Sequence, residues 1–168
     1  MIRPARLRDA RAIAEVHVAS WRHAYRGLLP DDYLDRLSVE EREKQRREHL
    51  EDPSSEWATL VADDAGRVVG FSTYGPSRDD DATAATGEVP AIYVDPDVVG
   101  TGVGRELFAE TVVALRAAGF TRASLWVLEG NVRARRFYEK AGWRWDGTIS
   151  QHDFDCANRP VVRYATDL

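Results

Sequence analysis

The sequence has little cysteine and no long apolar run, and each absence excludes a class of protein. Cys156 is the only cysteine among 168 residues, so an internal disulfide, a multi-cysteine metal site and a CxxC redox pair are all excluded. No segment approaches the length of a membrane span, and Met1 leads into the polar stretch 2–9 without the apolar run of a signal peptide. We therefore expect a cytoplasmic protein with no membrane partner.

The chain also lacks an excess of positive charge. Its formal net charge is -5, whereas nucleic-acid binders concentrate basic residues on one surface, so we expect no nucleic-acid partner. An amine or another cation fits this charge balance better. The histidines show no metal-ligand spacing, so no metal is expected. The length and the hydrophobic content of 43% predict one globular domain over residues 1–168.

The N-terminal half predicts a short strand, helices and a hairpin. A strand is expected near 2–7, then a helix capped by Asp9 and ending near Tyr25, then one or two charged helices over 31–50. The β-rich runs 57–62 and 68–74 flank Asp63-Asp64-Ala65-Gly66, a hairpin turn in which Gly66 takes positive φ. Residues 77–87 lack periodicity and predict a mobile surface loop, with Asp79, Asp80 and Asp81 either solvated or attracting a cationic amine.

The C-terminal half alternates strands and helices, which implies a parallel pair of strands. Strands are expected at 88–95, 122–128, 143–149 and 160–165, and helices at 102–118 and 132–140. Residues 151–159 read as an irregular connection. Pro90 lies inside a strand and donates no ladder hydrogen bond, so this strand should be bulged or splayed from a neighbour.

A glycine-rich turn joins an apolar strand to a helix over residues 91–104. Gly100, Gly102 and Gly104 stand at alternate positions, so backbone N–H groups at the positive end of the helix dipole are open to a phosphate or pyrophosphate. A merely structural tight turn would explain the glycines alone equally well. Arg105 and Glu106 follow where an ATP-binding Walker loop needs Lys and Ser or Thr, and the spacing departs from the GxGxxG dinucleotide fingerprint.

This turn and a second motif together resemble the GNAT N-acetyltransferase superfamily. Residues 94–96 and 100–104 are similar to its strand and pyrophosphate loop, and Asn131 with 137–143 is similar to its Asn-led helix that carries a tyrosine. The resemblance implies the acyl-CoA N-acyltransferase fold, of the α/β (α+β) class. This fold has a mixed, mostly antiparallel sheet of about seven strands with flanking helices, splayed at its central parallel strands. Val99 departs from the family, which usually has Arg or Gln there.

The resemblance also implies acetyl-CoA as co-substrate. Its pantetheine arm is expected to pair with the central strand, and its pyrophosphate to bind the glycine turn. Asn131 is equally expected as a helix cap, and Arg133 could reach the 3'-phosphate or simply face solvent. The residues expected to contact the coenzyme are Ile92, Tyr93, Val94, Val99, Gly100, Thr101, Gly102, Val103, Gly104, Asn131 and Arg133.

Transfer of an acetyl group to an amine needs a proton acceptor and a proton for the departing thiolate. By the resemblance, Tyr138 supplies that proton, unless it is only a half-buried helix residue. Glu88 accepts the amine proton directly or through water, unless it is only a surface residue at a strand end. His17, Trp21 and Tyr25 form one helical stripe that lines either the acceptor site or the core.

The sequence therefore predicts an N-acetyltransferase that moves an acetyl group from acetyl-CoA to a primary amine of a small molecule or peptide by direct attack. The alternative from another class is a non-catalytic acyl-CoA-binding regulatory module, against which Tyr138 and Glu88 speak. A homodimer formed through the last strand, 160–165, is also expected, because an edge strand offers unpaired backbone groups.

Overall fold

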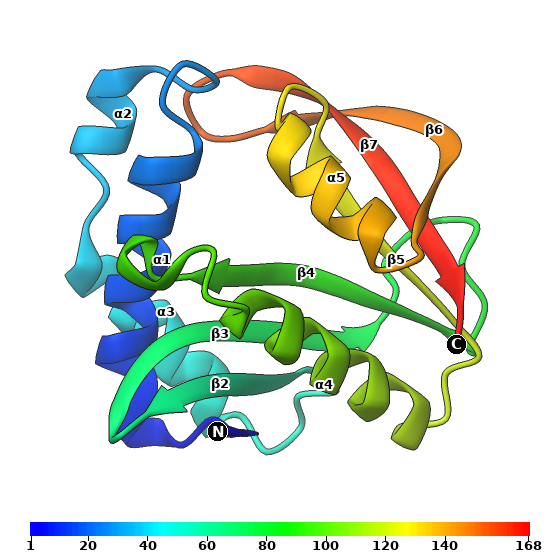
Figure 1. Cartoon of the computed structure of the whole chain (residues 1–168), viewed down its shortest axis with the longest axis horizontal. Coiled ribbons are helices and arrows are strands. Elements are labelled where there is room, and N and C mark those ends of the chain that lie inside the picture. The colour runs from blue at the N-terminus through cyan, green and yellow to red at the C-terminus, as the bar shows by residue number, and fades with distance from the viewer.

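The computed structural model describes residues 1–168 and contains a seven-stranded sheet flanked by helices (Figure 1). The strand order is β1-β2-β3-β4-β5-β7-β6, and every neighbouring pair is antiparallel except β4 and β5. The predicted fold class is confirmed. The elements are β1 (Ile2–Pro4), η1 (Leu7–Asp9), α1 (Ala10–Ala24), α2 (Asp31–Asp35), α3 (Val39–Glu51), β2 (Ala58–Asp64), β3 (Arg67–Pro76), β4 (Thr86–Val94), η2 (Pro96–Val98), α4 (Val103–Ala117), β5 (Arg122–Leu128), α5 (Val132–Lys140), β6 (Arg144–Asp153) and β7 (Asn158–Asp167).

Alternation along the strands sends side chains to two separate cores. On one face, Ile13 and Val16 of α1 pack against Phe71 of β3. On the other face, Phe108 of α4 and Tyr138 of α5 belong to a cluster that covers β4, β5 and β7. Figure 1 shows α4 and α5 in front of the sheet and α3 behind it. A ligand site on the α4/α5 face is therefore separated from one on the α1/α3 face by the sheet itself.

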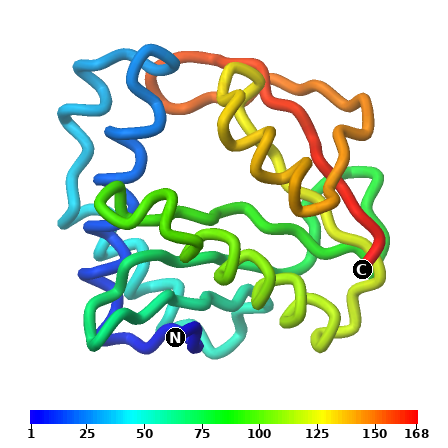
Figure 2. The backbone as a smooth tube through the Cα atoms, in the orientation of Figure 1, coloured from blue at the N-terminus to red at the C-terminus, as the bar shows by residue number.

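The two central parallel strands separate after a short contact. β4 and β5 pair only from Thr86 to Glu88, whose partner is Ser124. On its other side β4 has a bulge, because Val89 and Pro90 both face the single β3 residue Tyr74. Figure 2 shows the two strands close together near their starts and diverging beyond. The bulge and splay predicted from the proline are confirmed.

Three local predictions are wrong. Asp9 precedes α1, but its carboxylate does not cap that helix; it accepts a hydrogen bond from the Arg3 guanidinium at 2.7 Å, because this buried carboxylate needs a partner. Residues 151–159 are not an irregular connection, since β6 extends to Asp153 and β7 begins at Asn158. β7 is not an edge strand, because it lies between β5 and β6, and β6 forms that edge of the sheet.

The expectation that the acidic run of Asp79, Asp80 and Asp81 is solvated is also wrong for Asp79. Asp79 accepts hydrogen bonds from the Trp126 indole at 2.8 Å and from Arg163 at 3.1 Å, and its side chain is only 14% exposed. Arg163 also binds Asp81, which holds the segment after β3 against β7, and Asp146 of β6. No helix in this structure is both long and apolar enough to cross a lipid bilayer.

Candidate active site

The glycine turn presents a row of free backbone donors. The N–H groups of Gly100, Gly102, Val103, Gly104 and Arg105 donate no hydrogen bond, either to the backbone or to a side chain. They belong to the turn and to the first residues of α4, where the helix dipole adds partial positive charge. Because these donors lie next to each other, the turn suits a ligand with several anionic oxygens.

Glycine is required in this turn by the backbone itself. Gly100 and Gly102 have φ of +90° and +100°, a left-handed conformation that L side chains rarely adopt. A Cβ at Gly104 would lie 3.4 Å from Val94 and 3.9 Å from the ring of Phe137. The turn therefore sits beside the end of β4 and the face of α5 that carries the predicted acid.

The other residues expected at the coenzyme divide between the two faces of β4. Ile92 packs against the α4/α5 core, while Tyr93 faces α1. The Thr101 hydroxyl is bound to the carbonyl of Val98 at 2.7 Å. The Asn131 side chain accepts a hydrogen bond from the Ala134 N–H at 3.1 Å, which confirms its expected role as a helix cap. Arg133 is exposed on α5 and makes no ion pair.

Tyr138 lies on α5 at the centre of an aromatic cluster. Its ring is 5.4 Å from Phe108 and 5.3 Å from Phe137, measured between ring centroids. Burial, and to a lesser extent the Tyr93 phenol, raise the pKa of its hydroxyl, so the group stays protonated at neutral pH. The pKa of Tyr25 is raised by burial first, then by Tyr93, and least by the Tyr138 phenol. Three phenols from α1, β4 and α5 thus come together although they are far apart in the sequence.

Glu88 is the last residue of β4 that pairs with β5, so it stands where the strands begin to separate. It is buried, at 3% exposure, which excludes the alternative that Glu88 is only a surface residue at a strand end. Arg78 binds it through Nη2 at 2.8 Å, and also through its backbone N–H at 3.1 Å. The carboxylate can therefore accept a proton from an amine only after a contact with Arg78 is exchanged, or through a water.

The stripe on α1 becomes part of one aromatic group with β4. The His17 ring stacks on Tyr93 at 5.2 Å with an angle of 13° between the planes, and Trp21 lies 5.2 Å from His17 and 5.0 Å from Tyr25. Burial lowers the pKa of His17 to about 3, so the imidazole is neutral. His17 Nε2 and Trp21 Nε1 are buried without a hydrogen-bond partner. A core packed only for stability seldom leaves such donors and acceptors unpaired.

Sequence reasoning missed several polar residues on this face. Arg78, Trp126 and Arg163 surround Glu88 and Asp79 through the hydrogen bonds described above. Strand alternation could have placed Ser124, Trp126 and Leu128 on one face of β5. It could not have identified their partners, because those come from the segment between β3 and β4, far away in sequence.

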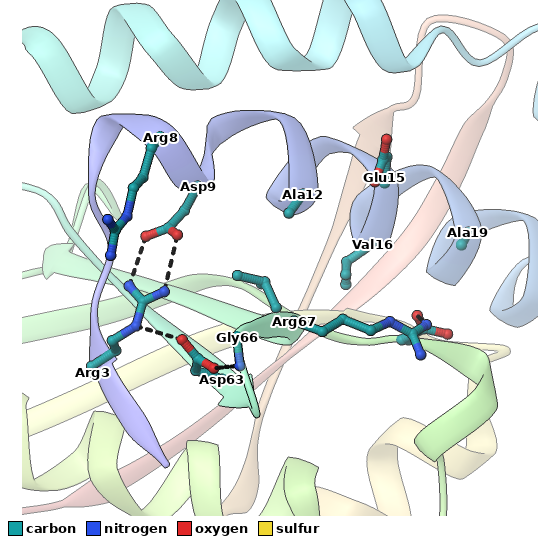
Figure 3. A pocket seen from close by; sticks show the side chains of 12 residues that line it. Arg3, Arg8, Asp9, Ala12, Glu15, Val16, Ala19, Asp63, Gly66 and Arg67 are labelled. Carbon is teal, nitrogen blue, oxygen red and sulfur yellow. Dashed lines mark hydrogen bonds and ion pairs between the residues drawn. The ribbon is translucent and has the colours of Figure 1, made fainter.

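A surface depression also lies away from these residues. Figure 3 shows this depression, of about 450 Å³, under the start of α1, where it is lined by Arg3, Asp9, Asp63 and Arg67 among others. Most of these charges are already paired, Arg3 with Asp9 and Asp63, and Arg67 with Asp95 at 2.6 Å. It includes neither the glycine turn nor Tyr138 and Glu88, so its size alone does not make it the active site.

Comparison with known proteins agrees with this arrangement. The model of the acetyltransferase (GNAT) family matches residues 15–143. The uncharacterized N-acetyltransferase YuaI of Bacillus subtilis is 35% identical over 130 residues, which are 77% of this chain and 72% of YuaI. Rv2775 of Mycobacterium tuberculosis, named as an N-acetyltransferase, is 30% identical over 97% of this chain and 91% of its own length.

The fold also has a close match among solved structures. The PaiA N-acetyltransferase of Thermoplasma acidophilum, solved in complex with coenzyme A, superposes with a TM-score of 0.80 at 19% identity and covers 100% of this chain and 98% of its own. At this identity the likeness concerns the fold. Taken with the family match and the two relatives, it identifies the chain as a member of the acetyltransferase (GNAT) family and as an acetyl-CoA-dependent N-acetyltransferase.

Proposed function

We propose that this chain transfers the acetyl group of acetyl-CoA to a primary amine of a small molecule or peptide by direct attack, with residues 1–168 acting as one domain. The observation that carries the proposal is the set of free N–H groups of Gly100, Gly102, Val103, Gly104 and Arg105, beside the end of β4 that no longer pairs with β5. An anion-binding turn and an opening in the sheet are the two features that this reaction needs.

The coenzyme would lie along the α4/α5 face. Its pyrophosphate fits the free N–H groups of the glycine turn. These groups supply hydrogen bonds without the Arg or Gln side chain that the family usually has at the position of Val99. Beyond Glu88, β4 no longer pairs with β5, so its edge near Ile92 is open to an amide-containing arm. At Val94 the carbonyl already accepts a hydrogen bond from the Ser20 hydroxyl at 2.8 Å, which the arm would have to replace. PaiA, which shares this fold, was solved with coenzyme A.

Tyr138 would donate the proton to the departing thiolate. Burial keeps its phenol protonated at neutral pH, as a general acid requires, and no protein group accepts a hydrogen bond from its hydroxyl. The hydroxyl is therefore available to a ligand. Its burial, and its nearness to Tyr25 at the end of α1 and Tyr93 of β4, support a hydroxyl directed toward the splay and away from the outer surface of α5.

Glu88 would accept the proton of the attacking amine, directly or through a water. It reaches this role from the other side of the splay, where its neighbours are Arg78 and Ser124. Its ion pair with Arg78 favours relay through water, because the carboxylate oxygens already accept hydrogen bonds. His17, Trp21 and Tyr25 would line the acceptor site on the same face.

The test is acetyl-CoA-dependent thiol release against a panel of amines, with coenzyme A binding measured by calorimetry. In Tyr138→Phe we expect kcat to fall roughly 10²- to 10⁴-fold, the usual worth of a general acid, while coenzyme A binding persists. Tyr164→Phe is the matched control, because Tyr164 belongs to the same aromatic cluster but its hydroxyl binds Glu139 at 2.7 Å. Unchanged turnover in Tyr138→Phe would remove the assigned acid, and absence of coenzyme binding in the wild type would overturn the proposed function.

A further inference from the structure

Two arginines of α3 face the aromatic group on the α1/α3 side of the sheet. Arg42 and Arg46 are one helical turn apart, so they lie on the same face of α3. The Arg46 guanidinium carbon is 4.9 Å from the centre of the Phe71 ring, and that of Arg42 is 5.8 Å from the centre of the Trp21 ring. Both cations are thus directed toward the acceptor side of β4.

Neither of these arginines has a carboxylate partner. Arg46 donates only to the Thr73 hydroxyl at 3.2 Å, and Arg42 only to the Gln45 side chain at 3.0 Å. Burial lowers the pKa of Arg46, which reflects the cost of removing a cation from water without a counter-ion. The adjacent Arg47, on another face of α3, is paired with Glu43 at 2.9 Å. The exposed Arg47 thus has a carboxylate partner, whereas the half-buried Arg42 and Arg46 have none.

Unpaired neutral groups lie beside the two cations. His17 Nε2 and Trp21 Nε1 are buried without partners, and both arginines add to the low pKa of His17. Tyr93, which stacks on His17 and stands on β4 beyond the splay, has its pKa raised by burial, and the charges of the two arginines only partly oppose this rise. One region therefore holds the two arginines without carboxylate partners, the two unpaired ring nitrogens, and β4, the strand that leads to the proposed reaction centre.

We infer that this region binds an anionic group of the acceptor, so that the acceptor is an amine that also carries a carboxylate, of the amino-acid class. This rests on the proposed function. A guanidinium binds a carboxylate in a planar, two-pronged arrangement, and Arg46 and Arg42 have no competing acid of their own. An acceptor that carries a second positive charge, such as a polyamine, would be repelled by both arginines. The pyrophosphate of the coenzyme is not the occupant, since its N–H groups lie across the sheet at α4.

The experiment compares free amino acids with their carboxamides as acceptors, which differ only in the negative charge beside the same amine. Thiol release is measured for each pair, and kcat/KM is expressed per neutral amine, because the carboxamide has the less basic amino group. In the wild type we expect at least one carboxylate acceptor to exceed its carboxamide about 10- to 100-fold, the range for a hydrogen bond to a charged group. In Arg46→Gln this ratio should fall at least about 10-fold, and Arg46→Lys should restore part of it.

Controls separate binding from folding and from the proposed function. Arg47→Gln removes a neighbouring cation that is already paired, so its carboxylate preference should equal that of the wild type. Arg42→Gln serves as the second test variant if Arg46→Gln unfolds at a Tm too low for the assay. A wild type without carboxylate preference, or an equal loss on both members of a pair in Arg46→Gln and Arg42→Gln, would overturn the inference while leaving the acetyltransferase intact. Absence of thiol release with every amine, carboxamides included, would instead overturn the proposed function.

Discussion

Replacing Gly102 by glutamate tests the anion-binding turn against a control that reproduces its backbone strain. Gly102 and Gly119 have φ of +100° and +93°, and a Cβ at either position has no atom closer than 3.9 Å. Gly102 precedes α4 and Gly119 follows it. Gly102→Glu and Gly119→Glu therefore impose the same left-handed strain, of about 1–2 kcal/mol, at the two ends of one helix.

The two variants should differ little in stability and greatly in coenzyme affinity. For a chain of this length, about 1–2 kcal/mol lowers Tm by roughly 2–8 °C. The helix dipole favours an acid at the start of α4 and disfavours one at its end, so Gly102→Glu should be the more stable of the two by about 0.5–1 kcal/mol. A carboxylate about 5 Å from a phosphate charge costs about 2–3 kcal/mol at an effective dielectric constant of 20 to 40, so binding at Gly102→Glu should weaken at least about 30-fold.

Calorimetric titration with coenzyme A, beside thermal melts of both variants, measures these effects separately. Gly102→Ala isolates the strain, and we expect it to bind coenzyme A more tightly than Gly102→Glu. If Gly102→Glu and Gly119→Glu bind coenzyme A with equal affinity, the free N–H groups of the turn are not the pyrophosphate site, and the reasoning from their lack of partners is refuted.

Three further predictions concern the ion pair between Arg3 and Asp9, the packing of β4 against Leu115, and the proposed base. Asp9→Asn should lower the free energy of unfolding, measured with urea at pH 7, by about 2–3 kcal/mol, because it breaks the bond to Arg3. That bond lowers the pKa of Asp9, so the loss is present above about pH 4 and should disappear as the pH falls through the lowered pKa. Gly87→Ala should lower the free energy of unfolding by about 1–3 kcal/mol, since its Cβ would lie 2.6 Å from a methyl group of the fully buried Leu115. The double variant Gly87→Ala/Leu115→Ala should lose less free energy than the two single variants add up to, because Leu115→Ala removes the clash. Simple additivity of the two losses would contradict the clash. Glu88→Gln should lower kcat about 10²-fold or more while coenzyme A binding persists, and an unchanged pH–rate profile would exclude it as the base.

The segment between β3 and β4 connects the residues of the proposed acceptor face. It contributes Arg78 to Glu88 and Asp79 to Trp126, and Arg163 joins it to β7. The Arg163 guanidinium also lies 5.6 Å from the Trp126 ring, and its contacts with three carboxylates raise its pKa. The proposed acceptor side is therefore built from ion pairs and aromatic rings, whereas the proposed coenzyme side presents free backbone N–H groups. This difference explains why the sequence holds a motif for the coenzyme and none for the acceptor.

The sequence by itself determined whatever depends on short-range chemistry. The helix from Val132 to Lys140, the strand from Arg122 to Leu128 and the cap at Asn131 follow from local periodicity and capping, and the structure has them at those positions. The glycine turn and the bulge at Pro90 belong to the same class, because a positive φ and a missing N–H act where the residue stands.

Only the tertiary structure decided which distant residues share a surface. No local signal places β7 inside the sheet, pairs Asp9 with Arg3, or brings Tyr138 to Tyr25 and Tyr93. Strand order and ion pairs depend on how the whole chain buries its apolar faces, and a buried charge takes whichever partner that burial brings near. The same reason explains Arg42 and Arg46: helical spacing places them on one face of α3, but that this face meets aromatic rings and no carboxylate is a property of the folded molecule alone.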